Sequence, residues 1–233
     1  MARSASSRPG KAVVKRLVGL LFVLGALPAL AAYTAAFVAF LASVPAVTSA
    51  QVAFLVGVTL YLGWHTLVGK PMKVYVFGHE LLHAVALWLS GGQVKAFKVS
   101  GQGGHVTGTK TNVFIALAPY LIPGYSVLVT LLYVIVGWFV DVQAYRLWWY
   151  GTLGATLAFH VVFTVEMAKT QQPDLLQNGR LLSLAVIYWV NLLCVALAVA
   201  LVSPPLTVGQ YVTDGAWRSA AYYTAIAHQL FGV

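Results

Sequence analysis

Long apolar runs are the feature that most constrains how this chain can fold. Residues 17–43 read LVGLLFVLGALPALAAYTAAFVAFLAS and contain no charged side chain. Crossing the roughly 30 Å hydrocarbon core of a bilayer takes about 20 helical residues. Further apolar runs follow, and we expect about six transmembrane helices, over residues 17–43, 51–69, 74–89, 113–140, 147–168 and 181–203.

The scarcity of charge supports this class and excludes a soluble one. Only 8% of the residues are charged, against about 25% in soluble domains. The sequence therefore predicts an all-α polytopic membrane protein, and without a long polar segment we expect one domain over residues 1–233. Residues 1–16 form a basic tail that we expect to be disordered. Residues 204–233 form a C-terminal tail with an interfacial helix from about Asp214.

The net charge of +9 does not indicate a nucleic-acid partner, because the basic residues are spread along the chain. Their densest cluster, within residues 3–16, borders the first apolar run. Such a cluster marks the cytoplasmic side of a membrane or holds anionic lipid headgroups. We expect an integral, multi-pass protein with a cytoplasmic N-terminus. The lack of other targeting signals favours a prokaryotic cytoplasmic membrane.

A polar, glycine-rich interval over residues 90–112 interrupts the helical pattern. Two β-type runs, at about 94–99 and 105–111, flank the turn sequence of residues 101–104. This pattern predicts a short β-hairpin.

A second interruption falls inside the 113–140 run. Pro119, Pro123 and Gly124 lie within six residues of one another. Proline cannot donate a backbone hydrogen bond and clashes with the preceding helical turn. We expect the helix to break or unwind there.

The motif FGHELLHA, at residues 77–84, places three polar side chains in an otherwise apolar run. On a helix, His79 and His83 are spaced i, i+4 and lie on one face, where two imidazoles can bind one zinc ion. Glu80 projects beside the metal and can take a proton from a water molecule that zinc activates. By chance this motif would occur in about one such chain in a thousand. The alternative is a polar contact between helices.

A catalytic zinc site usually has a third protein ligand and one open position. Asp174 is the favoured candidate, because a carboxylate is a good oxygen ligand and the preceding proline suits a broken backbone. Its alternative role is the N-cap of a short helix over residues 175–180. His160 is a candidate ligand, an outer partner of a ligand, or a satisfied bundle residue. Glu166 is a candidate ligand or a partner of Lys169, three residues further on.

The remaining polar residues have structural interpretations. His105 is expected to be a hydrogen-bonding loop residue, and His65 and His228 to be interfacial or structural. Asn191, in the middle of the last apolar run, predicts an interhelical hydrogen bond. Its alternative role is to hold a substrate backbone.

From Val76 to Asn191 the chain resembles the intramembrane site-2 proteases, peptidase family M50. The resemblance rests on FGHELLHA in a membrane helix, the glycine-rich segment GGQVKAFKVSGQGGHVTGT, the helical segment ALAPYLIP and a distant aspartate before another membrane helix. It covers about half of the chain.

This resemblance implies an intramembrane zinc endopeptidase with one zinc ion per chain. His79 and His83 would be zinc ligands, Asp174 the third ligand and Glu80 the catalytic base. The reaction would be hydrolysis of a peptide bond within or near a transmembrane segment of a membrane protein. The hairpin would be a re-entrant element that pairs with an unwound substrate segment.

Residues of the hairpin's first strand, Val94 and Val99, are accordingly candidate substrate contacts or supports of the site. The expected partners are a transmembrane protein or peptide and the lipid bilayer, and the sequence does not fix the oligomeric state. Two other functions stay open. A membrane metal-binding or transport protein could use the histidine pair, but it needs no base such as Glu80, and the chain shows no internal repeat. A catalytically idle relative could act as a membrane chaperone or assembly factor.

Overall fold

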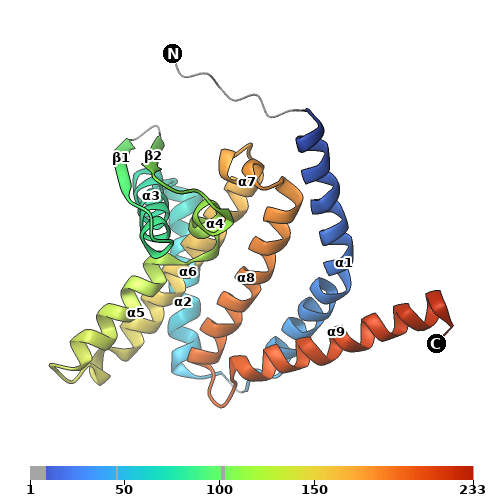
Figure 1. The fold of residues 1–233 in the computed structure, drawn as a ribbon. Coiled ribbons are helices and arrows are strands. Elements are labelled where there is room, and N and C mark those ends of the chain that lie inside the picture. The colour runs from blue at the N-terminus through green and yellow to red at the C-terminus, as the bar shows by residue number, and fades with distance from the viewer. Residues whose placement is uncertain (1–8, 46, 101–102, 233) are drawn as a thin grey trace.

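The computed structural model of the chain describes residues 9–45, 47–100 and 103–232. Over these residues the chain is helical, apart from its connections and one two-stranded antiparallel sheet (Figure 1). The predicted helical class and the predicted hairpin are thus confirmed. In chain order the elements are α1 (Pro9–Ala42), α2 (Ser49–Gly63), the π-helical turn η1 (Trp64–Val68), α3 (Met72–Leu89), β1 (Val94–Ser100), β2 (Gly103–Gly108), α4 (Val113–Leu121), α5 (Gly124–Gly137), the 3₁₀ turn η2 (Gln143–Tyr145), α6 (Arg146–Ala168), α7 (Pro173–Gln177), α8 (Arg180–Val202) and α9 (Val208–Phe231).

Among the described residues, four helices are long and apolar enough to cross a membrane: Leu17–Ala42, Ser49–Val68, Gln143–Ala168 and Arg180–Val202. The bent pair of α4 and α5 makes a fifth if it counts as one span. The predicted number of six is not confirmed. The 74–89 run does form a helix, α3, but its polar side chains, those of the FGHELLHA motif included, keep it out of this group.

The first helix begins earlier than predicted. α1 starts at Pro9, so residues 9–16 of the basic tail, which was expected to be disordered, form its first turns. Proline is favoured at the first position of a helix, and the lysine, arginine and alanine residues that follow are good helix formers. Residues 1–8 of the predicted tail lie outside the described residues.

Figure 1 shows two distinct ends of the bundle. The N-terminal end of α1, the hairpin and α7 lie at one end, called here the site end. α9 and the connection between α1 and α2 lie at the opposite end. α3 lies at the site end beside the hairpin, so the FGHELLHA motif is carried near one surface of the bundle.

α2 and α6 pack tightly because glycines let their backbones approach. A Cβ added at Gly57 would overlap the backbone carbonyl of Gly151, and one added at Gly154 would overlap the carbonyl of Phe54. Small residues permit this kind of close contact between membrane helices. The buried cluster around the contact consists of Phe54, Leu153, Leu157, Ala198 and Val202.

The hairpin has a shorter second strand than predicted. β1 pairs antiparallel with β2, and Lys98 lies opposite His105. β2 ends at Gly108, whereas the sequence pattern suggested a strand as far as residue 111. The predicted turn includes residues 101–102, which lie outside the described residues.

The predicted break within residues 113–140 is confirmed. α4 ends at Leu121, α5 begins at Gly124, and the two helices are bent by 71° relative to each other. Pro123 stands in the break, where it has no backbone N–H to donate and disfavours a helical residue before it. The bend lets α4 pack against α3, α7 and α8, which places α4 beside the candidate site.

The C-terminal helix is longer than predicted. α9 begins at Val208 and not near Asp214, because the Thr207 side chain caps its first turn within a capping box. The helix packs along α1, where the Tyr223 hydroxyl donates a hydrogen bond to the carbonyl oxygen of Gly25 at 2.6 Å.

Candidate metal centre

Two histidines on one face of α3 form the first half of the site. Because they are one helical turn apart, their rings point in the same direction, and His79 Nε2 and His83 Nε2 lie 3.2 Å apart. Their side chains are 11% and 12% exposed. The predicted pair of imidazoles on one helix face is therefore present, with the rings edge-on to each other and their centroids 4.8 Å apart.

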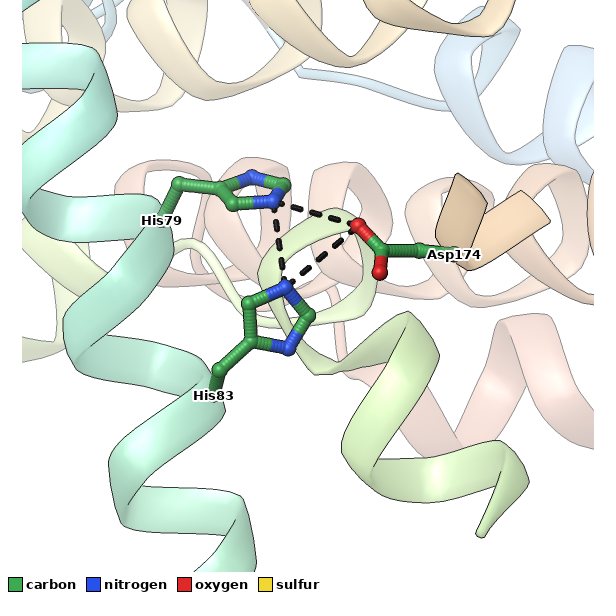
Figure 2. A group of neighbouring side chains, drawn as sticks. All are labelled: His79, His83 and Asp174. Carbon is green, nitrogen blue, oxygen red and sulfur yellow. Dashed lines mark hydrogen bonds and ion pairs between the residues drawn. The ribbon is translucent and has the colours of Figure 1, made fainter. Parts of the chain in front are cut away.

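Asp174 completes the group from the opposite side (Figure 2). Its Oδ2 lies 3.5 Å from His79 Nε2 and 3.4 Å from His83 Nε2. These three residues could hold a metal ion. The alternative role of Asp174 as an N-cap is wrong. Gln172 is the N-cap of α7, and Asp174 lies in the first turn with its carboxylate toward the histidines.

The other ring nitrogen of each histidine has a hydrogen-bond partner. His83 Nδ1 lies 2.8 Å from the carbonyl oxygen of Ile115. A carbonyl only accepts, so Nδ1 carries the proton, and Nε2 of the neutral ring presents its lone pair to the site. His79 Nδ1 lies 3.1 Å from the Tyr75 hydroxyl. Partners of this kind orient histidines that bind metals.

The spacing of the three donor atoms fits a metal ion. Zinc binds imidazole nitrogen and carboxylate oxygen at about 2.0–2.2 Å in a tetrahedral arrangement, which separates two ligand atoms by about 3.3–3.6 Å. The separations in the structure are 3.2, 3.4 and 3.5 Å. With neutral rings, the two nitrogen lone pairs and the carboxylate all face the space between them, where a cation is attracted to all three; protonated rings would instead pair with the carboxylate.

The histidines also set the charge of Asp174. Burial raises the pKa of its carboxyl, but hydrogen bonds and charge interactions with His79 and His83 lower that pKa by more. The result lies well below the usual value of about 3.9 for aspartic acid. The carboxylate is therefore ionised at neutral pH, as a metal ligand must be.

Glu80 lies beside the three donor residues. It is 7% exposed, and its carboxylate interacts electrostatically with His79, His83 and Asp174. β2 covers it, because a Cβ added at Gly104 would lie 2.6 Å from Glu80 Cγ and 3.0 Å from Glu80 Oε1. A glycine at position 104 thus leaves the room that the Glu80 side chain occupies.

A cavity of about 750 Å³ opens onto the group. Its walls come from α3, the whole of β2, the connection after β2, the start of α4, the end of α6, and α7 with the connection before it. The volume lies within the range of roughly 300–1,000 Å³ that is usual for ligand sites. The donor atoms and the Glu80 carboxylate therefore face a space that a second molecule can enter.

His160 lies outside the donor group. It is 8% exposed within α6 and interacts with the side chain of Asn191 on α8. Asn191 Nδ2 also donates a hydrogen bond to the carbonyl oxygen of Tyr120 at 2.8 Å. The predicted interhelical hydrogen bond of Asn191 is confirmed.

Glu166 belongs to a separate cluster. Its Oε1 lies 2.6 Å from Lys70 Nζ and 3.2 Å from His65 Nε2. The structure therefore pairs the Glu166 side chain with the segment in front of α3, and not with Lys169. His65 in turn lies 2.9 Å from the Tyr61 hydroxyl.

The hairpin residues differ in their distance from the site. His105 lies on β2 and lines the cavity. Val94 and Val99 lie on β1, opposite Gly108 and Gly104, and the residues that line the cavity do not include them. β2 is therefore the strand that faces the site.

Two tyrosines at the site were missed by the sequence analysis. Tyr75 precedes His79 by one helical turn, so its i, i+4 spacing contained a usable signal. The Tyr120 hydroxyl lies 3.5 Å from Asp174 Oδ2, although the two residues are 54 positions apart. No local pattern connects them, and the fold alone brings them together.

No protein-family model matches this sequence, and no curated protein or solved structure matches the chain. The resemblance to site-2 proteases therefore rests on the residues quoted above. The chemistry of the site follows from its own side chains: three convergent donor residues, one buried carboxylate and a cavity that reaches them.

Proposed function

We propose that this protein is an intramembrane zinc endopeptidase of the site-2 protease type. It would hydrolyse a peptide bond within or near a transmembrane segment of another membrane protein. The observation that carries the proposal is the position of Glu80, a buried carboxylate beside three convergent metal-binding side chains and a cavity. A protein that only stores or transports a metal ion needs the ligands but no base.

Zinc is the metal that this donor set favours. Two imidazole nitrogens and one carboxylate oxygen form a common catalytic zinc set that leaves one position open. When bound, zinc supplies a Lewis acid that polarises a carbonyl and lowers the pKa of water to about 7. The protein holds the donors in place through the partners of the histidine Nδ1 atoms, Tyr75 and Ile115.

Glu80 is the candidate general base. Its carboxylate can accept a proton from the attacking water and pass it to the leaving amine, a role that usually contributes about 10²–10⁴-fold in rate. The packing of Gly104 against Glu80 keeps that side chain beside the donor residues. Its burial also strengthens its interactions with charges, because the local dielectric constant is low.

The hairpin supports a peptide as the substrate. Every residue of β2 lines the cavity, and the sheet formed by the described residues contains only β1 and β2. One edge of β2 therefore has no strand partner there, and an extended peptide could add to it through backbone hydrogen bonds. Non-helical backbone at membrane depth is tolerated where it lines a cavity of this kind.

The basic residues support an orientation with the site end toward the cytoplasm. Short cytoplasmic segments of membrane proteins carry an excess of lysine and arginine. Arg146 and Arg218 belong to the end away from the site. The other basic residues of the described segments belong to the start of α1, to α3 and the hairpin with their connections, to the connection before α7, and to the start of α8: Lys11, Lys15, Arg16, Lys70, Lys73, Lys95, Lys98, Lys110, Lys169 and Arg180. The N-terminus would then be cytoplasmic, in a prokaryotic cytoplasmic membrane.

Cleavage by matched variants tests the proposal. Full-length protein in proteoliposomes is incubated with a panel of synthetic transmembrane peptides, and mass spectrometry identifies the products. Wild type should cut at least one peptide, and Glu80→Gln should lower the rate at least about 100-fold while it keeps the same metal content. Equal cleavage by Glu80→Gln would refute the assigned base. Metal binding without any cleavage by wild type would favour a metal-binding protein instead.

A further inference from the structure

The donor residues come from two helices that depend on a third for their relative position. α3 carries the two histidines, and α7 carries Asp174. α7 has only five residues and packs against α4 and α8, while α4 packs against α3, α7 and α8. The separation between the two halves of the donor group therefore depends on α4.

Tyr120 is the α4 residue that contacts both halves. Its ring packs edge-on against the His79 ring, with the centroids 5.2 Å apart. Its hydroxyl donates toward Asp174 Oδ2 at 3.5 Å. Its carbonyl oxygen accepts the hydrogen bond from Asn191, which ties this point of α4 to α8. The side chain is 1% exposed, so its position is fixed by packing on all sides.

Tyr120 also completes a set of outer partners. The two histidines are held through their Nδ1 atoms by Tyr75 and by the carbonyl of Ile115. The Tyr120 hydroxyl has the equivalent position beside Asp174. Loss of such a partner typically weakens metal binding by about 10–100-fold.

We propose that Tyr120 is a positioning residue of the metal centre, whose hydroxyl holds Asp174 Oδ2 toward the two histidines. This inference rests on the metal centre of the proposed function and not on peptidase activity. A distance of 3.5 Å is long for an O–H···O hydrogen bond. We therefore expect the effect at the lower end of the usual range, about 10-fold in metal affinity.

The test is Tyr120→Phe, which removes the hydroxyl and keeps the ring against His79. Full-length protein in detergent is titrated with Co²⁺ alone, followed by visible absorption, and then with Zn²⁺ in competition. Tyr120→Phe should weaken both affinities about 10-fold and change the Co²⁺ spectrum, which reports the geometry of the ligands.

Tyr211→Phe is the matched control. Tyr211 is also 1% exposed, lies in the cluster between α1, α8 and α9, and its hydroxyl has no hydrogen-bond partner among the described residues. This variant should bind both metals with wild-type affinity and show the wild-type Co²⁺ spectrum.

Three results would overturn the inference. A wild-type affinity and spectrum in Tyr120→Phe would remove the positioning role and leave the proposed peptidase standing. Equal losses in Tyr120→Phe and Tyr211→Phe would show a general effect of lost packing. No metal binding by wild type would remove the metal centre, and the inference with it. Because the readout is metal binding, a failure of peptide cleavage is a separate result.

Discussion

The contact between β2 and Glu80 predicts that Gly104→Ala separates catalysis from metal binding. A Cβ at position 104 would lie 2.6 Å from Glu80 Cγ and 2.8 Å from the carbonyl oxygen of Lys98, whereas ordinary contact begins at 3.4 Å. The Lys98 atom belongs to the paired strand, so the hairpin cannot simply turn away. Glu80 must therefore move, and a misplacement of about 1 Å can cost about 100-fold in rate.

The assay compares peptide cleavage and metal content in the same preparations. Gly104→Ala should keep the wild-type metal content, because the atoms nearest to the added methyl group belong to Glu80 and Lys98 and not to the donor residues, and should cleave about 100-fold more slowly. Gly25→Ala is the control, because a Cβ added there would have no atom within 4 Å apart from its chain neighbours and the nearby backbone of its own helix. Wild-type cleavage by Gly104→Ala, or loss of its metal, would refute this reasoning.

Three further predictions concern stability. Gly154→Ala forces a methyl group into the backbone of α2, and overpacking of this kind costs about 1–3 kcal/mol. Its thermal unfolding in detergent should therefore occur several degrees lower than that of Gly25→Ala, and equal unfolding temperatures would contradict the tight helix contact. Lys70→Ala removes a partly exposed ion pair with Glu166 and should lower the stability by no more than about 1 kcal/mol in the same assay. A larger loss of stability would show that this ion pair contributes more than an exposed pair does. Chelation of metal should lower the unfolding temperature of wild type but not of Asp174→Ala, since a ligand at 100 times its Kd stabilises a protein by about 2.7 kcal/mol. An equal drop in the unfolding temperature of both proteins would place the metal elsewhere.

The parts of the fold that the sequence predicts correctly have local signals. The i, i+4 spacing of His79 and His83 places them on one helix face whatever surrounds the helix. The glycine-rich interval forms a hairpin, and Pro123 marks the bend between α4 and α5. In each case the chemistry of a few adjacent residues decides the local structure.

The third donor residue is only partly accessible from sequence. Asp174 carries a good ligand atom, but the same residue could equally have capped a helix. The structure decides between the two roles, because Gln172 takes the N-cap position and Pro173 the first turn. A shift of one or two residues in the start of the helix would change the direction in which the carboxylate points.

Contacts between residues far apart in the chain could not be predicted from the sequence. Tyr120 on α4 contacts Asp174 on α7 because the bend between α4 and α5 lets α4 pack against α7. Glu166 on α6 pairs with Lys70, which precedes α3. The number of spans is a different case. The 74–89 run forms the helix α3, but by length and composition α3 is not among the helices that could cross a membrane, so six spans are not confirmed.

Metal content of the purified full-length protein tests the metal centre most directly. Wild type, His79→Ala and Asp174→Ala are compared after zinc reconstitution, with His160→Ala as the control, because His160 is a buried histidine outside the donor group. We predict about one zinc ion per chain in wild type and in His160→Ala, none in His79→Ala and sharply weakened binding in Asp174→Ala. Zinc that survives Asp174→Ala but is lost in His160→Ala would contradict the donor set, and a wild type without zinc would contradict the metal centre itself.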